Sequence, residues 1–251
     1  MVEQIDRTLP RLSQIFATLA IQASHASAPA ALGPLRAAGA LVRHESNAKF
    51  NSFANLGGSR RAALELGLQS GASTLLFCDF DRALHWAEFH PAELAEVAAQ
   101  LGVHDFTVLG RTARAFGTHP RIQRDTEEII NHVYALASGR GWDVTAAARG
   151  LSRRAAEALL AGCPEQSIGV DMAWPLFLQR AGGFSLGYLA TEGLEFETAD
   201  RFGDEIAAAG GRERWIDQLD TSPQQWALRL DLARIEVEAA ARYTGGARPD
   251  G

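Results

Sequence analysis

Two aspartates with one residue between them follow an apolar run in this chain. The run Thr74–Cys78 is a strand candidate, and Asp79 and Asp81 come directly after it. Because residues i and i+2 of an extended backbone point to the same side, the two carboxylates converge if the extended conformation continues through them. Close carboxylates repel one another unless a proton or a cation lies between them. The spacing therefore predicts a site for Mg²⁺ or Mn²⁺, hard cations that prefer carboxylate oxygens. The alternative is a solvated turn, where aspartate is common.

Two adjacent arginines precede this strand. The stretch from Asn55 reads N-L-G-G-S-R-R-A-A-L-E-L-G and predicts a helix with Ser59 as its N-cap. Arg60 and Arg61 then lie near the amino end of that helix. Backbone N–H groups and guanidinium groups at such a position suit an anionic ligand. The alternative for either arginine is a solvated helix face.

The rest of the chain predicts the elements that position these residues. Further strand candidates are Ile15–Gln22, Gly39–Arg43, Phe106–Leu109 and Phe184–Ala190. Further helix candidates are Pro29–Ala38, Pro91–Leu101, Asp125–Ala137, Ser152–Leu160, Val170–Ala181 and Gln224–Ala241. In the first half, strands and helices alternate at short spacing, which is typical of a parallel sheet wrapped by helices. Ligands of such sheets bind beyond the carboxyl ends of the strands, and Asp79 lies at one of these ends.

Composition limits the class of protein. The chain has 251 residues, 47% hydrophobic content and a formal net charge of −6, which suffices for one sizeable core. The mild acidity argues against a general binder of nucleic acid or membrane surfaces. Two cysteines without a Cys-x-x-Cys pair fit a reducing cytoplasm and give no zinc-site spacing. We expect no signal peptide, and no membrane span, because no apolar run approaches about 20 residues.

The segment with the arginine pair and the two aspartates resembles the donor-binding half of GT-A fold glycosyltransferases, in particular inverting, family-2-like members. In that family a Gly- and Arg-containing helix start is followed by a strand that ends in Asp-x-Asp. Gly57, Arg60, Arg61, Asp79 and Asp81 fall at the matching positions. The resemblance implies a GT-A-like α/β fold with a mostly parallel sheet. It also implies that these five residues bind a nucleotide-sugar donor, and that Asp79 and Asp81 hold Mg²⁺ or Mn²⁺ against its diphosphate.

The resemblance continues more weakly downstream, where Gly150–Gly162 leads into Ile168–Gly183. Many members have a helix there, followed by an acidic residue that opens a second helix. Asp171 matches that residue by position, and in inverting members it removes the proton of the acceptor hydroxyl. A base needs to lie within hydrogen-bond reach of that proton. The alternative for Asp171 is a helix N-cap. Trp174, one turn later, is either a sugar-stacking residue or part of the core.

Two positions depart from the family pattern. Many inverting members have Glu-Asp where this chain has Val170-Asp171. The first strand is usually followed by an acidic residue that holds the nucleotide base, whereas residues 22–25 read Gln-Ala-Ser-His. These departures leave the base of the donor undefined by the resemblance.

Other polar residues are weaker candidates for this site. A third metal ligand in such a site is often a later His or Asp. Since no histidine follows position 132, Glu192 and Asp200 are the acidic candidates. His119, Arg111 and Arg114 are candidate contacts to the donor or the acceptor.

The expected organisation is a GT-A-like catalytic domain over residues 1–210, a helical extension over 211–243 and a flexible tail over 244–251. The expected function is cytoplasmic transfer of a sugar from a nucleoside-diphosphate-sugar donor to the hydroxyl of a small-molecule or glycan acceptor. We expect no nucleic-acid partner. The helix Gln224–Ala241 either packs on its own domain or forms the face of a homodimer.

Three alternatives remain open. Phosphatases of the haloacid-dehalogenase type also place Asp-x-Asp after a strand, with the first Asp as nucleophile. They normally continue with Gly and Thr and use a later lysine, whereas here Arg82-Ala83-Leu84 follows and no lysine lies downstream. A nucleotidyltransferase that makes the nucleotide sugar usually has a Gly-rich basic segment after its first strand, and residues 24–34 do not read that way. The third alternative is a non-catalytic GT-A-like binding module.

Overall fold

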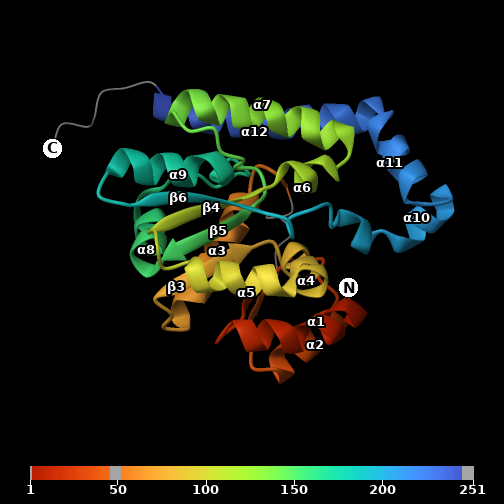
Figure 1. The fold of residues 1–251 in the computed structure, drawn as a ribbon, viewed down its shortest axis with the longest axis horizontal. Coiled ribbons are helices and arrows are strands. Elements are labelled where there is room, and N and C mark those ends of the chain that lie inside the picture. The colour runs from red at the N-terminus through yellow and green to blue at the C-terminus, as the bar shows by residue number, and fades with distance from the viewer. Residues whose placement is uncertain (1, 46–51, 245–251) are drawn as a thin grey trace.

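The computed structural model describes residues 2–45 and 52–244 and shows an α/β fold with more helix than strand (Figure 1). Its strands are β1 (Ala20–Ala23), β2 (Leu41–His44), β3 (Thr74–Cys78), β4 (Phe106–Arg111), β5 (Ala148–Ser152) and β6 (Leu186–Thr191). Its helices are α1 (Val2–Ile15), α2 (Pro29–Ala37), α3 (Leu56–Gln69), α4 (Phe80–Phe89), α5 (Pro91–Gln100), α6 (Ala113–Gly117), α7 (Arg121–Ser138), α8 (Arg153–Gly162), α9 (Val170–Ala181), η2 (Thr198–Arg201, a 3₁₀ turn), α10 (Gly203–Ala209), α11 (Arg212–Asp220) and α12 (Pro223–Thr244). Residues 245–251, most of the predicted tail, lie outside the described residues.

The strands form two sheets rather than one mostly parallel sheet. Strands β1 and β2 pair in parallel, and a separate four-stranded sheet has the order β3-β5-β4-β6. Strand β5 is antiparallel to both of its neighbours, whereas β4 and β6 are parallel. The sheet is therefore mixed, which corrects the sequence prediction. That prediction missed β5, because Ala-Arg-Gly-Leu-Ser lacks the apolar run or the alternation that marks a strand.

Several helices follow the sequence prediction closely. Helix α9 has the predicted bounds, and α8 begins after the predicted cap, where the Ser152 hydroxyl accepts a hydrogen bond from the Ala155 N–H. Helix α3 differs, because it begins one turn early with Asn55 as its N-cap, so Ser59 lies inside the helix. The bounds of the predicted strand Ile15–Gln22 are also corrected, because helix α1 extends through Ile15 and β1 begins only at Ala20.

Two hydrophobic clusters make up most of the core. The larger one lies between the four-stranded sheet and helices α7, α8, α9 and α12, and it contains Trp174 and Tyr134. The second lies on the other side of the sheet and contains residues of α1, α2, α4 and α5, among them Trp86. Helices thus cover both sides of the four-stranded sheet (Figure 1). In the described part of the chain, no helix combines the length and the apolar character needed to cross a bilayer.

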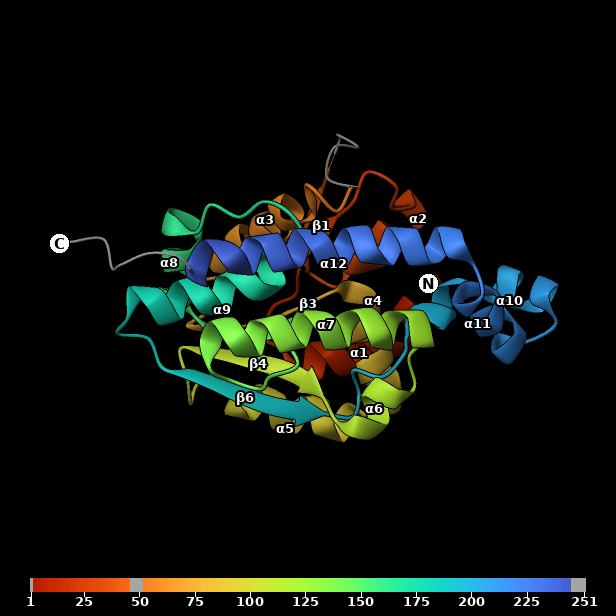
Figure 2. The same cartoon turned by 90° about the horizontal axis from the view of Figure 1, so that it is seen from above.

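Helix α12 packs on the main body of the protein. It lies beside α7, as the view from above shows (Figure 2), and it also packs against α9. At the α9 contact the backbone approach is close, because a Cβ at Gly169 would lie 2.5 Å from the Cβ of Ala239. The buried face of α12 is formed by Leu232, Ala233, Glu236, Ala239 and Ala240. Leu230 lies outside this buried face, and its side chain is half exposed.

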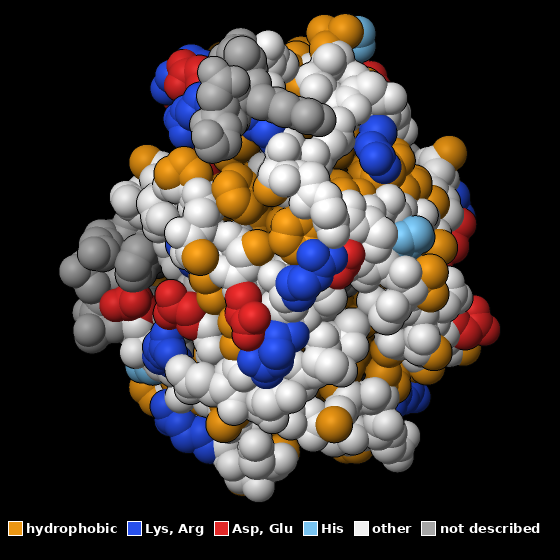
Figure 3. All heavy atoms as spheres, turned by 90° about the vertical axis from the view of Figure 1, so that its left-hand side faces the viewer, with side chains coloured by type: hydrophobic (Ala, Val, Ile, Leu, Met, Phe, Trp, Pro, Cys, Tyr) orange, Lys and Arg blue, Asp and Glu red, His pale blue; other side chains and the backbone are white. Residues whose placement is uncertain are grey.

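The surface shows no extended area of one charge sign on the side drawn in Figure 3. Acidic and basic side chains are interspersed there with hydrophobic ones. This agrees with the small net charge of the chain.

Candidate functional site at the carboxyl end of strand β3

The Asp-x-Asp motif lies at a strand-to-helix junction. Strand β3 ends at Cys78, Asp79 is the N-cap position of α4, and Asp81 lies in the first turn of that helix. The extended backbone therefore stops before the motif is complete. Strand alternation does not direct the two carboxylates to the same side, so the backbone conformation on which their convergence was predicted is corrected.

Arg60 joins two of the predicted site residues. Its Nη2 lies 3.2 Å from an oxygen of Asp79, and its Nη1 lies 2.8 Å from an oxygen of Asp171. The second oxygen of Asp171 lies 3.1 Å from Nη2 of Arg149 on β5. Asp171 is thus held between two buried guanidinium groups, and its side chain makes no capping bond to the start of α9. The structure gathers Arg60, Asp79 and Asp171, which lie up to 111 positions apart in the sequence, into one chain of ion pairs.

The two arginines that contact Asp171 have pKa values shifted in opposite directions. Burial lowers the pKa of Arg60, but the nearby carboxylates of Asp171 and Asp79 raise it more, so the net shift is upward. Burial also lowers the pKa of Arg149, and Asp171 only partly offsets that effect. Removal of the shared carboxylate would leave two buried cations without their common partner.

A second set of ion pairs surrounds Asp81. The segment after β6 crosses this end of the sheet, and its Arg201 places Nη1 2.8 Å from an oxygen of Asp81. The same segment supplies Glu197, a buried carboxylate 3.3 Å from Nε of Arg82. Burial raises the pKa of Glu197, Arg82 opposes that shift, and Asp81 adds to it. Each of the three carboxylates at the end of β3 therefore has a guanidinium partner. The pairs are Asp79 with Arg60, Asp81 with Arg201 and Glu197 with Arg82.

This arrangement does not fit a preformed divalent cation site. Among residues 2–45 and 52–244, no three His, Cys, Asp or Glu side chains lie in an arrangement that could hold a metal ion. The positive charges that compensate Asp79 and Asp81 come from arginine side chains. The two candidates for a third metal ligand contact other side chains. Glu192 pairs with Arg114, and an oxygen of Asp200 lies 2.7 Å from Nδ1 of His85 on α4.

A cavity of about 480 Å³ opens beside Arg60 and Asp79. It lies between β1, α3 and β3, and most of its lining side chains are apolar. Its volume falls in the range typical of small-molecule sites, which combine apolar walls with a few polar groups. Arg60 and Asp79 supply charged groups at the carboxyl end of β3, while Gln22 of β1 also lines the cavity.

The other predicted donor residues have different environments. Arg61 donates to the carbonyl oxygens of Leu159, Leu160 and Cys163 at 2.7–3.0 Å, so its guanidinium caps the carboxyl end of α8. Gly57 packs against the chain before α9, where an added Cβ would lie 2.4 Å from a backbone oxygen. These two residues fix α3 against α8 and the start of α9, which positions Arg60 next to Asp171.

Trp174 belongs to the core in this structure. It is buried in the larger cluster and packs edge-to-face with Phe77 of β3, with 5.5 Å between ring centroids. Its ring therefore offers no exposed face to a sugar.

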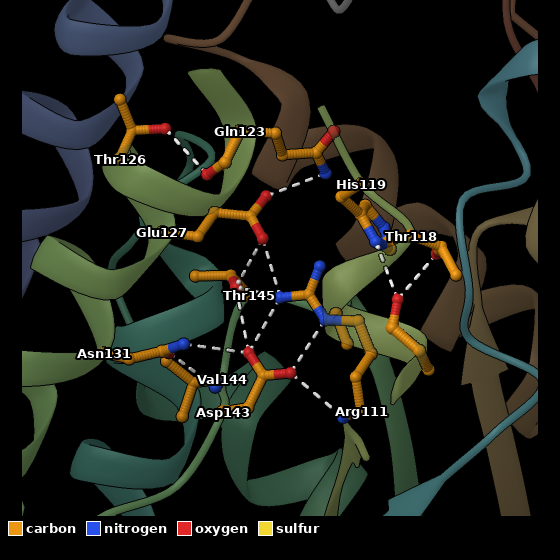
Figure 4. A network of polar contacts seen from close by, with 12 residues as sticks. Arg111, Thr118, His119, Gln123, Thr126, Glu127, Asn131, Asp143, Val144 and Thr145 are labelled. Atoms are coloured by element: carbon orange, nitrogen blue, oxygen red, sulfur yellow. Dashed lines mark hydrogen bonds and ion pairs between the residues drawn. The ribbon is translucent and has the colours of Figure 1, made fainter. Parts of the chain in front are cut away.

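Arg111 is the centre of a separate buried network (Figure 4). Its guanidinium lies 2.6 Å from Glu127 of α7 and 2.8 Å from Asp143, and it also donates to Thr145. Arg229 of α12 contacts the same glutamate at 2.8 Å. The network ties β4, α7 and α12 together. These contacts explain the burial of Arg111 better than a role in donor binding does.

His119 is buried beside this network. Burial, followed by the positive charge of Arg111, lowers its pKa to about 3. The imidazole is therefore neutral at physiological pH, and its Nδ1 lies 3.1 Å from the Ala115 carbonyl oxygen. Arg114, the third of these candidates, is half exposed and pairs with Glu192 and Glu195.

Glu236 of α12 is a residue near this site that the sequence analysis did not single out. Its side chain is 2% exposed, and its Oε2 is buried without a hydrogen-bond partner. Burial raises its pKa well above the usual value, and the charge of Asp171 raises it further. The available signal was an acidic residue on the apolar stripe of a helix, between Ala233 and Ala239.

Glu236→Gln is expected to stabilise the protein at pH 8 and to leave its stability unchanged at pH 4. The folded-state pKa of Glu236 lies above its unfolded value of about 4.5. The wild-type contribution is therefore complete below that pH and is lost as the pH rises toward the folded-state pKa. Each unit of upward shift corresponds to about 1.4 kcal/mol. Urea denaturation at the two pH values measures the difference, with Glu238→Gln on the exposed face of α12 as control. An equal effect of Glu236→Gln at both pH values would show that this carboxyl is ionised in the fold.

Comparison with known proteins gives no match to this chain among family models, curated proteins or solved structures.

Proposed function

We propose that this protein is a glycosyltransferase that moves a sugar from a nucleoside-diphosphate-sugar donor to an acceptor hydroxyl. The observation that carries the proposal is the ion-pair chain through Asp79, Arg60 and Asp171 beside a cavity of about 480 Å³. The sequence order of these residues is the order found in the GT-A fold glycosyltransferases that the chain resembles. The mixed α/β sheet places the cavity next to the carboxyl end of a strand, where ligands of such folds bind.

The donor is proposed to bind with its nucleoside toward the cavity and its diphosphate toward the arginines. Apolar walls suit a planar base and a ribose, whereas guanidinium groups suit phosphoryl oxygens. The leaving diphosphate carries the charge that develops during transfer, and fixed cationic groups stabilise such charge most effectively in a site that excludes water.

Asp171 has two possible roles in this proposal, base or anchor. As the base, it would need to exchange one arginine contact for the acceptor hydroxyl, because both of its oxygens are in ion pairs. As an anchor, it keeps Arg60 in place for the diphosphate. The observed contacts support the anchoring role more directly, since both carboxylate oxygens of Asp171 already face guanidinium groups.

The function is tested by a thermal-shift screen of UDP, GDP and their sugar conjugates on the wild type and Asp79→Asn. A ligand at about 100 times its dissociation constant adds roughly 2.7 kcal/mol of stability. We expect one nucleotide to stabilise the wild type and to stabilise Asp79→Asn less, because Arg60 loses one of the two carboxylates that hold it. We also expect that nucleotide to be released from its sugar conjugate when acceptors are added. Asp125→Asn is a matched control, because Asp125 is 41% exposed and 3.1 Å from its arginine, against 38% and 3.2 Å for Asp79.

Absence of stabilisation by every nucleotide, together with absence of nucleotide release, would contradict this function. Hydrolysis of phosphate monoesters that is lost in Asp79→Asn would instead support the phosphatase alternative, in which this aspartate is the nucleophile.

A further inference from the structure

The carboxylates at the end of β3 are already paired with cations supplied by the protein. The Arg201–Asp81, Arg60–Asp79 and Arg82–Glu197 contacts measure 2.8, 3.2 and 3.3 Å. With the pairs at Asp171 included, four carboxylates face four guanidinium groups. Two like charges in an Asp-x-Asp motif need a compensating positive charge, and here arginines provide it.

We propose that this site binds the donor diphosphate without a divalent cation, and that Arg201 provides the exchangeable contact. When the diphosphate binds, the Arg201 guanidinium moves from Asp81 to a phosphoryl oxygen. The identity of the ligand as a diphosphate rests on the proposed function. The neutralisation of Asp79 and Asp81 by arginines does not depend on it.

The surroundings of the three arginines decide which of them can exchange partners. Arg60 is buried and is also held by Asp171. Arg82 is buried and also donates to the Ala146 carbonyl oxygen at 3.1 Å. Arg201 is 49% exposed. Exposed ion pairs contribute little to stability, so an exchange of carboxylate for phosphate at Arg201 costs little. Its planar fork also matches the geometry of a phosphoryl group.

A divalent cation at Asp81 has to displace the same guanidinium. It gains the attraction of the carboxylates but brings its own charge next to Arg60, Arg82 and Arg201. The like charges of these three arginines oppose that step. Removal of Arg201 removes both the competitor and one of the repelling charges, so it is expected to create cation binding where the wild type has none.

The first arm of the test measures Mn²⁺ binding in the absence of nucleotide, by calorimetry and by the Mn²⁺ spin-resonance signal. We expect no binding at Asp81 in the wild type, and binding in Arg201→Ala that the double variant Arg201→Ala/Asp81→Asn abolishes. Arg154→Ala is the matched control. Its ion pair with Asp105 measures 2.7 Å with exposures of 57% and 19%, against 2.8 Å, 49% and 18% for Arg201 and Asp81.

The second arm measures binding of UDP and GDP with EDTA and with Mn²⁺. We expect the nucleotide that binds to do so equally well in both conditions. We also expect Arg201→Ala to weaken it at least about tenfold in EDTA, since a charged hydrogen bond to phosphate is lost. Arg154→Ala tests whether loss of any exposed arginine weakens nucleotide binding, and we expect it to leave the affinity unchanged. Arg201→Lys keeps the positive charge but removes the planar guanidinium, and we expect it to weaken nucleotide binding in part.

Wild-type Mn²⁺ binding that disappears in Asp81→Asn would overturn the proposal, as would nucleotide binding that EDTA abolishes. Cation-dependent binding of a nucleotide would leave the glycosyltransferase function standing. Failure of every nucleotide to bind would count against that function, and in that case the Mn²⁺ arm still decides whether arginines or cations neutralise the motif.

Discussion

Asp171→Ala is expected to lower the free energy of unfolding by about 3–5 kcal/mol, the range observed when one partner of a buried ion pair is removed. Both oxygens of Asp171 contact buried guanidinium groups, Arg60 at 2.8 Å and Arg149 at 3.1 Å. The substitution leaves two buried cations without their shared carboxylate. Urea denaturation at pH 7 measures the loss, and Asp125→Ala at an exposed ion pair is expected to change stability by less than about 1 kcal/mol.

The conservative variant Asp171→Asn separates the two roles proposed for this residue. If Asp171 anchors Arg60, nucleotide affinity falls in Asp171→Asn measured well below its unfolding temperature. If it is the base, affinity is kept and sugar transfer alone is lost. A loss of stability below about 1 kcal/mol in Asp171→Ala would show that the two arginine contacts do not hold the fold, and the anchoring role would then be abandoned.

Arg111→Met is expected to cost about 3–5 kcal/mol at pH 7 and less at pH 3, where the stabilisation is partly lost. Burial raises the pKa of Glu127, but Arg111 and then Arg229 lower it more, to about 2. For a carboxyl with a lowered folded-state pKa, the stabilisation is present above the unfolded value and is lost as the pH falls through the folded value. Without Arg111 the buried carboxylates of Glu127 and Asp143 lose their main cation, so the penalty is largest where both are ionised.

The measurement is urea denaturation of the wild type and Arg111→Met between pH 3 and pH 8. Arg121→Ala, at an exposed ion pair on the same helix as Glu127, serves as control and is expected to have little effect at any pH. A penalty of the same size at pH 3 and pH 7 would indicate lost packing of the arginine side chain rather than lost charge pairing.

The sequence predicts the helices better than the sheet, for identifiable reasons. Helix α9 has its predicted bounds, because an apolar stripe is followed by two glycines that end it. Strand β5 was missed because its residues include Arg149, whose charge is compensated by Asp171 only in the folded protein. Pairwise compensation between distant residues leaves no local pattern, so the mixed sheet was not predictable from periodicity.

The candidate site was predictable in part. The resemblance assigned Arg60, Asp79 and Asp171 to one site, and in the structure these three side chains lie together. The extended backbone expected through Asp79 and Asp81 was wrong, because α4 begins at Phe80 between them. The partner of Asp81 is 120 residues away, and only the course of the chain after β6 brings it there.

The packing of α12 has a consequence for the order in which this protein folds during synthesis. Chains leave the ribosome from the amino end, so Arg60, Asp79 and Asp171 are all made well before α12. Until α12 docks on α7 and α9, the start of α9 lacks the cover that Ala239 and Glu236 provide, and Glu127 lacks Arg229. A nascent chain that has not yet released α12 therefore lacks one of the two guanidinium partners of Glu127, and this ion-pair network is completed only when α12 docks.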